Sequence, residues 1–218
     1  MFIDRADAGR QLAVSTVHAA DSAALILGLP RGGVPVANQI ASAWGASLDV
    51  VVVRKLGAPA NPEFALGAIG EDGVVVVDDE VRRRLGVTPA QLEKAIVDQR
   101  RELVRRVLLY RGDRPRLPVA GRDVVVVDDG LATGSTAVAA VAVARLMGAA
   151  RVTVAVPVGS AQAVERLRSV ADDVACLEQP EPFYSVSQHY DDFAQVSDTD
   201  VLSILARRLE GNTRRFSL

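Results

Sequence analysis

The chain has 218 residues, a length that fits one large domain or a domain with an appended lobe. Hydrophobic residues make up 49% of the chain and charged residues 24%, so enough apolar side chains are present to form a core. The net charge of −2 argues against a surface that coats nucleic acid, the single cysteine excludes an intrachain disulfide, and no apolar run approaches the roughly 18 residues that span a bilayer.

The first half of the chain alternates short apolar runs with helical patterns. Its first thirteen residues are charged and lack the apolar segment of a secretion signal, so we expect a soluble, cytoplasmic protein. We then expect strands over 23–29, 48–54 and 74–79, and helices over about 34–44 and 89–110. Thr88 can cap the second of these helices, and Pro89 suits its first position. Residues 55–73 have no clear period and contain several glycines and prolines, which predicts a long loop.

The second half repeats this alternation. We expect strands over 124–127, 151–158 and 173–177, and helices over about 135–147, 161–170 and 198–209. Because alternating helices and all-apolar strands are typical of a parallel sheet covered on both faces, we predict an α/β fold with a doubly wound, mostly parallel sheet. No linker separates two independent domains, so we interpret residues 1–218 as a single domain. The lone Cys176 lies in an apolar run and is expected to be a core thiol.

The run VVVVDDGLATGST, residues 124–136, carries the strongest functional signal. Two carboxylates, Asp128 and Asp129, end a strand of four valines, and a turn of small and hydroxyl-bearing residues follows. That turn continues through Ala132, Thr133, Gly134, Ser135 and Thr136. Its small residues let backbone N–H groups converge, and the next helix adds unpaired N–H groups and the positive end of its dipole. The pattern therefore predicts a site for a phosphate monoester, although it is neither a Walker A loop nor a GxGxxG turn.

The acid pair has two possible readings, and a second copy of it in the chain helps to separate them. VVVVDD also occurs at residues 74–79, but three arginines follow there instead of a glycine turn, so Asp78 and Asp79 are interpreted as a solvated strand end or a helix N-terminus. Beside the turn, in contrast, Asp128 and Asp129 can accept hydrogen bonds from sugar hydroxyls or hold a hydrated Mg²⁺. A phosphorylated ribose presents a phosphate and a diol in that order.

The whole run resembles the phosphoribosyl-pyrophosphate (PRPP) signature of the type I phosphoribosyltransferases, and its LATG form is most similar to that of the adenine and uracil enzymes. The resemblance implies Mg²⁺-dependent transfer of the 5-phosphoribosyl group of PRPP to a nitrogenous acceptor, with release of pyrophosphate. In this reading Asp128 and Asp129 act in catalysis and hold Mg²⁺ through water, and residues 132–136 bind the 5-phosphate. The resemblance also implies nucleotide salvage and a homodimer, while the composition and charge argue against a membrane or nucleic-acid partner.

Other elements of the family can be placed on this chain by the same resemblance. The PRGG turn, residues 30–33, stands where the family binds pyrophosphate: Arg31 can meet its oxygens, while Gly32 and Gly33 allow a close backbone approach. Lys55, next to Arg54, stands where a strand runs into a flexible lid, here expected over about 56–73. A closing lid would exclude water from the reactive donor. Residues 80–116 are then a basic helical insertion, usually a solvated face.

The acceptor is left open by the sequence. A small hood over about 178–197 contains an aromatic cluster, from which Phe183 is the first choice and Tyr184 the second for stacking on the acceptor, although a small satellite core explains the cluster equally well. Ala132 stands where hypoxanthine-guanine enzymes have an aspartate for the purine ring, which argues against a 6-oxopurine held in that way. A base, an amine or another nitrogen compound remains possible, and so does a PRPP-binding regulator that performs no transfer.

Overall fold

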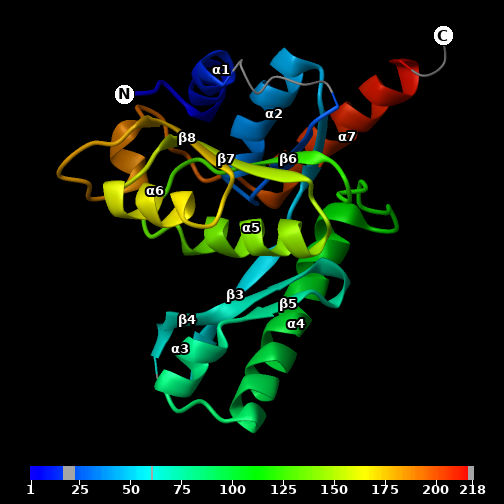
Figure 1. Ribbon diagram of the computed structural model, residues 1–218. Coiled ribbons are helices and arrows are strands. Elements are labelled where there is room, and N and C mark those ends of the chain that lie inside the picture. The colour runs from blue at the N-terminus through cyan, green and yellow to red at the C-terminus, as the bar shows by residue number, and fades with distance from the viewer. Residues whose placement is uncertain (17–22, 60, 216–218) are drawn as a thin grey trace.

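The computed structural model of the protein describes residues 1–16, 23–59 and 61–215 and contains two sheets (Figure 1). The main sheet has five strands in the order β2-β1-β6-β7-β8, and every neighbouring pair is parallel. These strands are β2 (Ser47–Val50), β1 (Leu25–Gly28), β6 (Asp123–Val127), β7 (Arg151–Val158) and β8 (Asp173–Glu178). The predicted α/β class with a mostly parallel sheet is therefore confirmed.

Helices cover both faces of the main sheet (Figure 1). One face carries α1 (Arg5–Ser15), α2 (Gly33–Trp44) and α7 (Asp198–Arg215), and the other carries α5 (Ser135–Leu146) and α6 (Ala161–Arg168). Cys176 packs against the apolar core between the main sheet and the helices α5 and α6, as expected for a core thiol. Burial raises the pKa of its thiol to about 11. Within the described ranges, no helix has both the length and the apolar character needed to cross a membrane.

The second sheet lies on the far side of α5 from the main sheet (Figure 1). It is antiparallel, in the order β3-β4-β5, with strands β3 (Val53–Ala58), β4 (Asn61–Gly70) and β5 (Val75–Val77). The helices α3 (Asp79–Arg84) and α4 (Pro89–Arg111) pack beside it, so the 80–116 region is helical as expected. Asp78 caps α3 by accepting from the N–H of Val81, and Thr88 caps α4 with a capping box.

The predicted long loop over 55–73 is wrong, because most of this segment forms the β3–β4 hairpin. Gly67 and Gly70 serve close packing, whereas Gly73 has a φ of 78° in the turn before β5. A Cβ on Gly67 would overlap the carbonyl oxygen of Val76 on β5, and one on Gly70 would lie 2.5 Å from Cγ1 of Val143 on α5. The sequence does not show which residues will pack against these glycines. The prediction of a loop therefore depended on glycine content alone.

Two strand predictions also need correction. The apolar run 48–54 is not one strand: β2 ends at Val50 in the main sheet, and β3 begins at Val53 in the second sheet. The run 74–79 forms β5 of the second sheet rather than another strand of the parallel sheet. Finally, α7 continues to Arg215, beyond the expected end at 209. The chain therefore leaves the main sheet after β2 and returns to it only at β6.

A buried ionic cluster marks the point where the chain leaves the main sheet. Arg111, at the end of α4, donates from Nε to Oε2 of Glu71 at 2.8 Å and from Nη1 to Oδ2 of Asp49 at 2.5 Å. Its Nη2 also donates to the carbonyl oxygen of Val50, while Oε1 of Glu71 accepts from the N–H of Val52. The side chains of Arg111 and Glu71 are only 7% and 4% exposed. These bonds satisfy hydrogen-bonding groups of the backbone between β2 and β3. The chain can therefore end β2 in one sheet and begin β3 in the other.

Replacing Arg111 by alanine should destabilise the fold strongly. Two buried carboxylates would lose their shared cation, and breaking a buried ion pair from one side costs about 3–5 kcal/mol. The control is Arg116→Ala, which removes a more exposed pair with Asp72 and should cost less than about 1 kcal/mol. Urea denaturation of both variants measures the free energies of unfolding, and equal losses would contradict a special role for the buried cluster.

Candidate functional site

The acid pair and the PRGG turn meet at the carboxyl ends of two neighbouring strands. β1 and β6 are parallel with Gly28 opposite Val127, and the N–H of Leu29 donates to the carbonyl oxygen of Val127 at 2.9 Å. A Cβ on Gly32 would overlap Oδ2 of Asp129, and a Cβ on Gly33 would overlap the carbonyl oxygen of Val127. The structure thus brings two separately predicted motifs into direct contact, and it explains why the turn requires both glycines.

The surroundings of the acid pair disfavour negative charge on Asp128. The backbone N–H of Asp129 donates to Oδ1 of Asp128 at 2.9 Å. Burial, followed by the neighbouring charge of Asp129, raises the pKa of the Asp128 carboxyl well above its usual value. A pair of this kind favours a proton or a cation beside it.

A magnesium ion fits this donor set in one particular way. Two carboxylates, completed by water and by phosphate oxygens of a substrate, are a common environment for Mg²⁺. The residues that the structure describes contain no cluster of three or more His, Cys, Asp or Glu that could hold a metal by itself. The acid pair is thus the part of this site whose donor chemistry fits Mg²⁺.

Arg5 is a site residue that the sequence analysis missed. Its Nε donates to Oδ2 of Asp129 at 2.7 Å, and its Nη1 donates to the carbonyl oxygen of Ala194 at 2.8 Å. Its Cζ also lies 3.8 Å from the centroid of the Phe193 ring, a cation–π arrangement. Arg5 and Asp129 are 124 positions apart, so only the folded chain reveals their contact.

The N-terminal segment and the predicted hood form one unit around Asp129. The N–H of Phe2 donates to His189, and the N–H of Asp191 donates back to Phe2. Tyr190 donates from its hydroxyl to the carbonyl oxygen of Asp129 at 2.6 Å, and burial raises the pKa of that hydroxyl. Phe2, Ala8, Val158 and Tyr190 make a small buried cluster. The satellite-core explanation of the aromatic residues is therefore supported.

The aromatic residues proposed for acceptor stacking lie at different depths in this hood. Phe183 is partly buried against the cluster, and its ring stacks on that of His189 with a centroid distance of 5.7 Å. Tyr184 is 74% exposed. Phe193 packs against Tyr190 and Arg5, the two residues that contact Asp129 from this side. Stacking of Phe183 on an acceptor stays a prediction.

The turn over 132–136 opens toward solvent at the start of α5. Gly134 has φ of 70°, which favours glycine, and as the N-cap residue it offers no side chain to α5. In the first turn, the N–H of Ser135 donates to Oγ1 of Thr133 at a long 3.4 Å. The hydroxyls of Thr133 and Ser135 lie 3.2 Å apart, and Thr133 and Thr136 are exposed. Arg166 of α6, another residue that we had not predicted, reaches Ser135 Oγ at 3.5 Å. Uncapped N–H groups, hydroxyls and an arginine together favour binding of an anion.

The main-chain frame holds this turn against the neighbouring strand. The N–H of Leu131 donates to Val158 at 2.9 Å, and the N–H of Ser160 donates to Leu131 at 3.0 Å. The hydroxyl of Ser160 donates to the carbonyl oxygen of Ala132 at 2.9 Å. The turn is thus anchored on one side by β7 while its N–H groups at the start of α5 remain available.

A cavity of about 410 Å³ connects the remaining predicted residues. Lys55, Pro30 and Thr136 line it together, so parts of the expected pyrophosphate and phosphate sites share one space. Arg54 and Arg106 line it as well. Burial and the charge of Arg106 lower the pKa of Arg54, which is evidence of crowded positive charge. Arg31 lies on the adjoining turn and is half-buried. Such a cavity suits an oxygen-rich anion.

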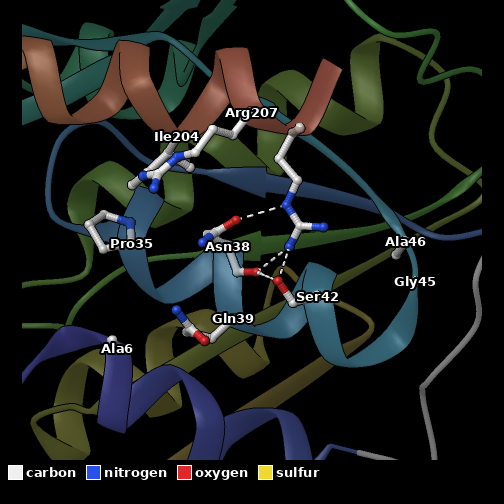
Figure 2. Close-up of a pocket in the computed structure, with 10 residues that line it drawn as sticks. Ala6, Pro35, Asn38, Gln39, Ser42, Gly45, Ala46, Ile204 and Arg207 are labelled. Atoms are coloured by element: carbon white, nitrogen blue, oxygen red, sulfur yellow. Dashed lines mark hydrogen bonds between the residues drawn. The ribbon is translucent and has the colours of Figure 1, made fainter. Parts of the chain in front are cut away.

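A different cavity, of about 570 Å³, lies between α1, α2 and α7 (Figure 2). Asn38, Ser42 and Arg207 line it, and Arg208 crosses it by donating to Oδ1 of Asn38 at 2.8 Å. None of the site residues predicted from the sequence lines this cavity. The candidate site is therefore the region around the acid pair, despite the larger volume elsewhere.

Comparison with known proteins identifies relatives over most of the chain. The phosphoribosyl transferase domain model matches residues 4–193. Two Mycobacterium tuberculosis proteins, Rv0571c of strain H37Rv and MT0597 of strain CDC 1551, are provisionally named phosphoribosyl transferases and are each 49% identical over 95% of this chain. The chain spans about half of their length, 47%. The crystal structure of TT1426 from Thermus thermophilus is 47% identical, with a TM-score of 0.90 over 95% of this chain and 98% of that one.

The raised pKa of Asp128 predicts a pH-dependent effect of Asp128→Asn on stability. Because the folded state keeps this carboxyl protonated to higher pH, it contributes stability at low pH that is lost as pH rises through the raised pKa. Asparagine cannot ionise, so the variant should gain stability over the native chain by a margin that begins to grow above about pH 4, the ordinary pKa of aspartate, and levels off once the pH has passed the raised pKa.

Urea midpoints measured at several pH values test this expectation. Asp123→Asn is the matched control, because Asp123 is an exposed residue at the start of the same strand. It should leave the pH dependence unchanged. A margin for Asp128→Asn that stays constant or shrinks with pH would show that the carboxyl is not held in its neutral form.

Proposed function

Because the chain belongs to the phosphoribosyl transferase domain family, we propose that it transfers the 5-phosphoribosyl group of PRPP to a nitrogenous acceptor and releases pyrophosphate. The observation that carries the proposal is the contact of the acid pair with the PRGG turn through Gly32, next to the open turn that begins α5. A phosphate, a diol and a pyrophosphate are the three groups of PRPP, and these three features can receive one each.

The 5-phosphate binds the turn over 132–136 in this proposal. Its oxygens accept from the uncapped N–H groups of α5 and from the hydroxyls of Thr133 and Thr136, while Arg166 adds a positive charge near Ser135. This anchor lies away from the anomeric carbon. Its binding energy therefore positions the reacting carbon instead of taking part in bond breaking.

The pyrophosphate occupies the basic cavity beside residues 30–33. Arg31 and Lys55, with Arg54 and Arg106 nearby, offset the negative charge that grows as the bond to the anomeric carbon breaks. Gly32 and Gly33 supply close backbone approach. The β3–β4 hairpin, which carries Arg54, Lys55 and Gly57, borders this cavity and takes the shielding role that we had assigned to a loop.

The acid pair faces the ribose. Asp128 and Asp129 accept from its hydroxyls and favour the positive charge that develops on the ring as pyrophosphate leaves, by analogy with other glycosyl transfers. These two carboxylates would hold Mg²⁺, which when bound would supply Lewis-acid stabilisation of the leaving group. A nitrogen of the acceptor attacks from the opposite face, and no protein nucleophile is required.

The finer parts of the proposal concern the setting of the reaction. We propose that the acceptor is a nucleobase-like compound, that the reaction serves nucleotide salvage in the cytoplasm, and that residues 1–218 act as one domain in a homodimer. Asp128, Asp129 and the turn over 132–136 are the residues on which activity should depend most. The alternative, a regulator that binds PRPP without turnover, makes the opposite prediction about pyrophosphate release.

The first test is release of pyrophosphate from PRPP and Mg²⁺ in the presence of purines, pyrimidines and amines, with products identified by mass spectrometry. Release that depends on one acceptor supports the transferase. A protein that binds PRPP in calorimetry but releases no pyrophosphate with any acceptor would instead be a regulator. If the protein does not bind PRPP at all, both the transferase and the regulator proposals are wrong.

Thr133→Ala should raise the KM for PRPP by about 10- to 100-fold, because one hydrogen bond to a charged phosphate is worth about 1.5–3 kcal/mol. Thr199→Ala provides the control, since Thr199 is an exposed threonine at the start of α7. Steady-state kinetics at saturating acceptor give both constants. An unchanged KM in the Thr133 variant would move the 5-phosphate away from this turn.

A further inference from the structure

The guanidinium of Arg5 is held on three sides within the candidate site. Asp129 accepts from its Nε, Ala194 accepts from its Nη1, and the ring of Phe193 lies beneath its plane. The side chains of Arg5 and Asp129 are only 12% and 16% exposed. A side chain with this many contacts is positioned rigidly, which is unusual for an arginine that serves only solubility.

Part of the hydrogen-bonding capacity of Arg5 remains unused. A guanidinium has five N–H groups, and the two bonds to Asp129 and Ala194 occupy two of them. The structure shows no further hydrogen bond from Arg5 to the described part of the chain. No fully buried polar side-chain atom among the described residues lacks a partner, so Nη2, which makes no hydrogen bond within the described part of the chain, is not fully buried. Its two N–H groups can therefore donate to a ligand.

The position of Arg5 relates it to the acceptor rather than to the donor. Asp129 lies between Gly32, on the turn proposed for pyrophosphate, and Arg5, which contacts Phe193 and Ala194 of the 178–197 hood. In the proposed function, Arg31, Lys55 and the turn over 132–136 bind the anionic groups of the sugar donor. Arg5 is a further cation on the hood side, and no anionic group of the sugar donor is left for it.

We propose that Arg5 selects the acceptor by binding its carboxylate, so that the acceptors of this protein are planar nitrogen heterocycles that carry a carboxylate group. This inference rests on the proposed transferase function. The planar fork of the guanidinium matches the two oxygens of a carboxylate, and Phe193 keeps the fork in a fixed plane. The bond between Nε and Asp129 joins this subsite to the ribose subsite, which places the acceptor ring above the anomeric carbon.

Direct binding tests the inference independently of turnover. The full chain is saturated with ribose 5-phosphate and Mg²⁺. Ribose 5-phosphate cannot react with the probes, because its anomeric carbon carries no pyrophosphate leaving group. Isothermal titration then compares two matched pairs of probes: pyridine-3-carboxylate with pyridine-3-carboxamide, and 2,4-dioxopyrimidine-6-carboxylate with 2,4-dioxopyrimidine. We expect each acid to bind at least ~10-fold tighter than its uncharged partner, as charge-assisted hydrogen bonds imply.

Three variants identify the residue responsible. Arg5→Gln should bring the acid-to-neutral affinity ratio close to one, and Arg5→Lys should restore part of it. Arg10→Gln is the matched control, because Arg10 lies on the same helix but is exposed and pairs only with Asp7 among the described residues. It should keep the native ratio. A ratio near one in the native protein, or an unchanged ratio in Arg5→Gln, would overturn the inference.

The binding and turnover assays fail in distinguishable ways. If the acids bind through Arg5 but PRPP releases no pyrophosphate with any acceptor, the transferase function is wrong and the carboxylate subsite stands. If pyrophosphate is released only with uncharged acceptors, the function stands and the carboxylate subsite is wrong.

Discussion

The candidate site depends on the parallel pairing of β1 with β6. Because both strands end at the same edge of the sheet, the turns that follow them are forced together, and Gly32 comes so close to Asp129 that no Cβ fits between them. This contact turns two ordinary strand-to-helix connections into one surface with an acid pair at its centre. A Cβ on Gly33 would overlap backbone atoms of Val127 and Asp128, and one on Gly32 would overlap the Asp129 carboxylate, so the geometry leaves little freedom in this part of the sequence.

The second sheet packs on α5 through apolar residues, and an electrostatic junction also links it to the main sheet beside the site. Arg111, Asp49 and Glu71 bind the backbone on both sides of the passage from β2 to β3, and this passage lines the basic cavity through Val51–Val53. Directly after it come Arg54 and Lys55, while α4 adds Arg106 from the region that seemed to be only a basic insertion. The insertion is thus part of the cavity wall, and the buried cluster places its cationic residues relative to the main sheet.

The two ends of the matched domain converge on the same residue, Asp129. Arg5 reaches the side chain of Asp129 from α1, and Tyr190 reaches its carbonyl oxygen from the hood. Their backbones are joined by the bridge between Phe2 and Tyr190. In an acid pair whose burial raises the pKa of Asp128, Arg5 supplies a positive charge that partly balances the site. The N-terminal segment is therefore packed with the hood as one structural unit.

Local patterns in the sequence were sufficient for the parts of the protein that depend on neighbouring residues. The valine runs predicted β6, the small-residue turn predicted an uncapped helix start at α5, and Thr88 with Pro89 predicted the start of α4, because each effect acts within a few residues. The sequence by itself also determined the family-like motifs around Asp128 and residues 30–33. Only the tertiary structure decided that 48–54 splits between two sheets, that the glycine-rich segment after Lys55 is a hairpin, and that Arg5, Arg106 and Arg166 join the site. Those outcomes depend on contacts between residues far apart in the chain, and such contacts produce no periodic pattern in the sequence.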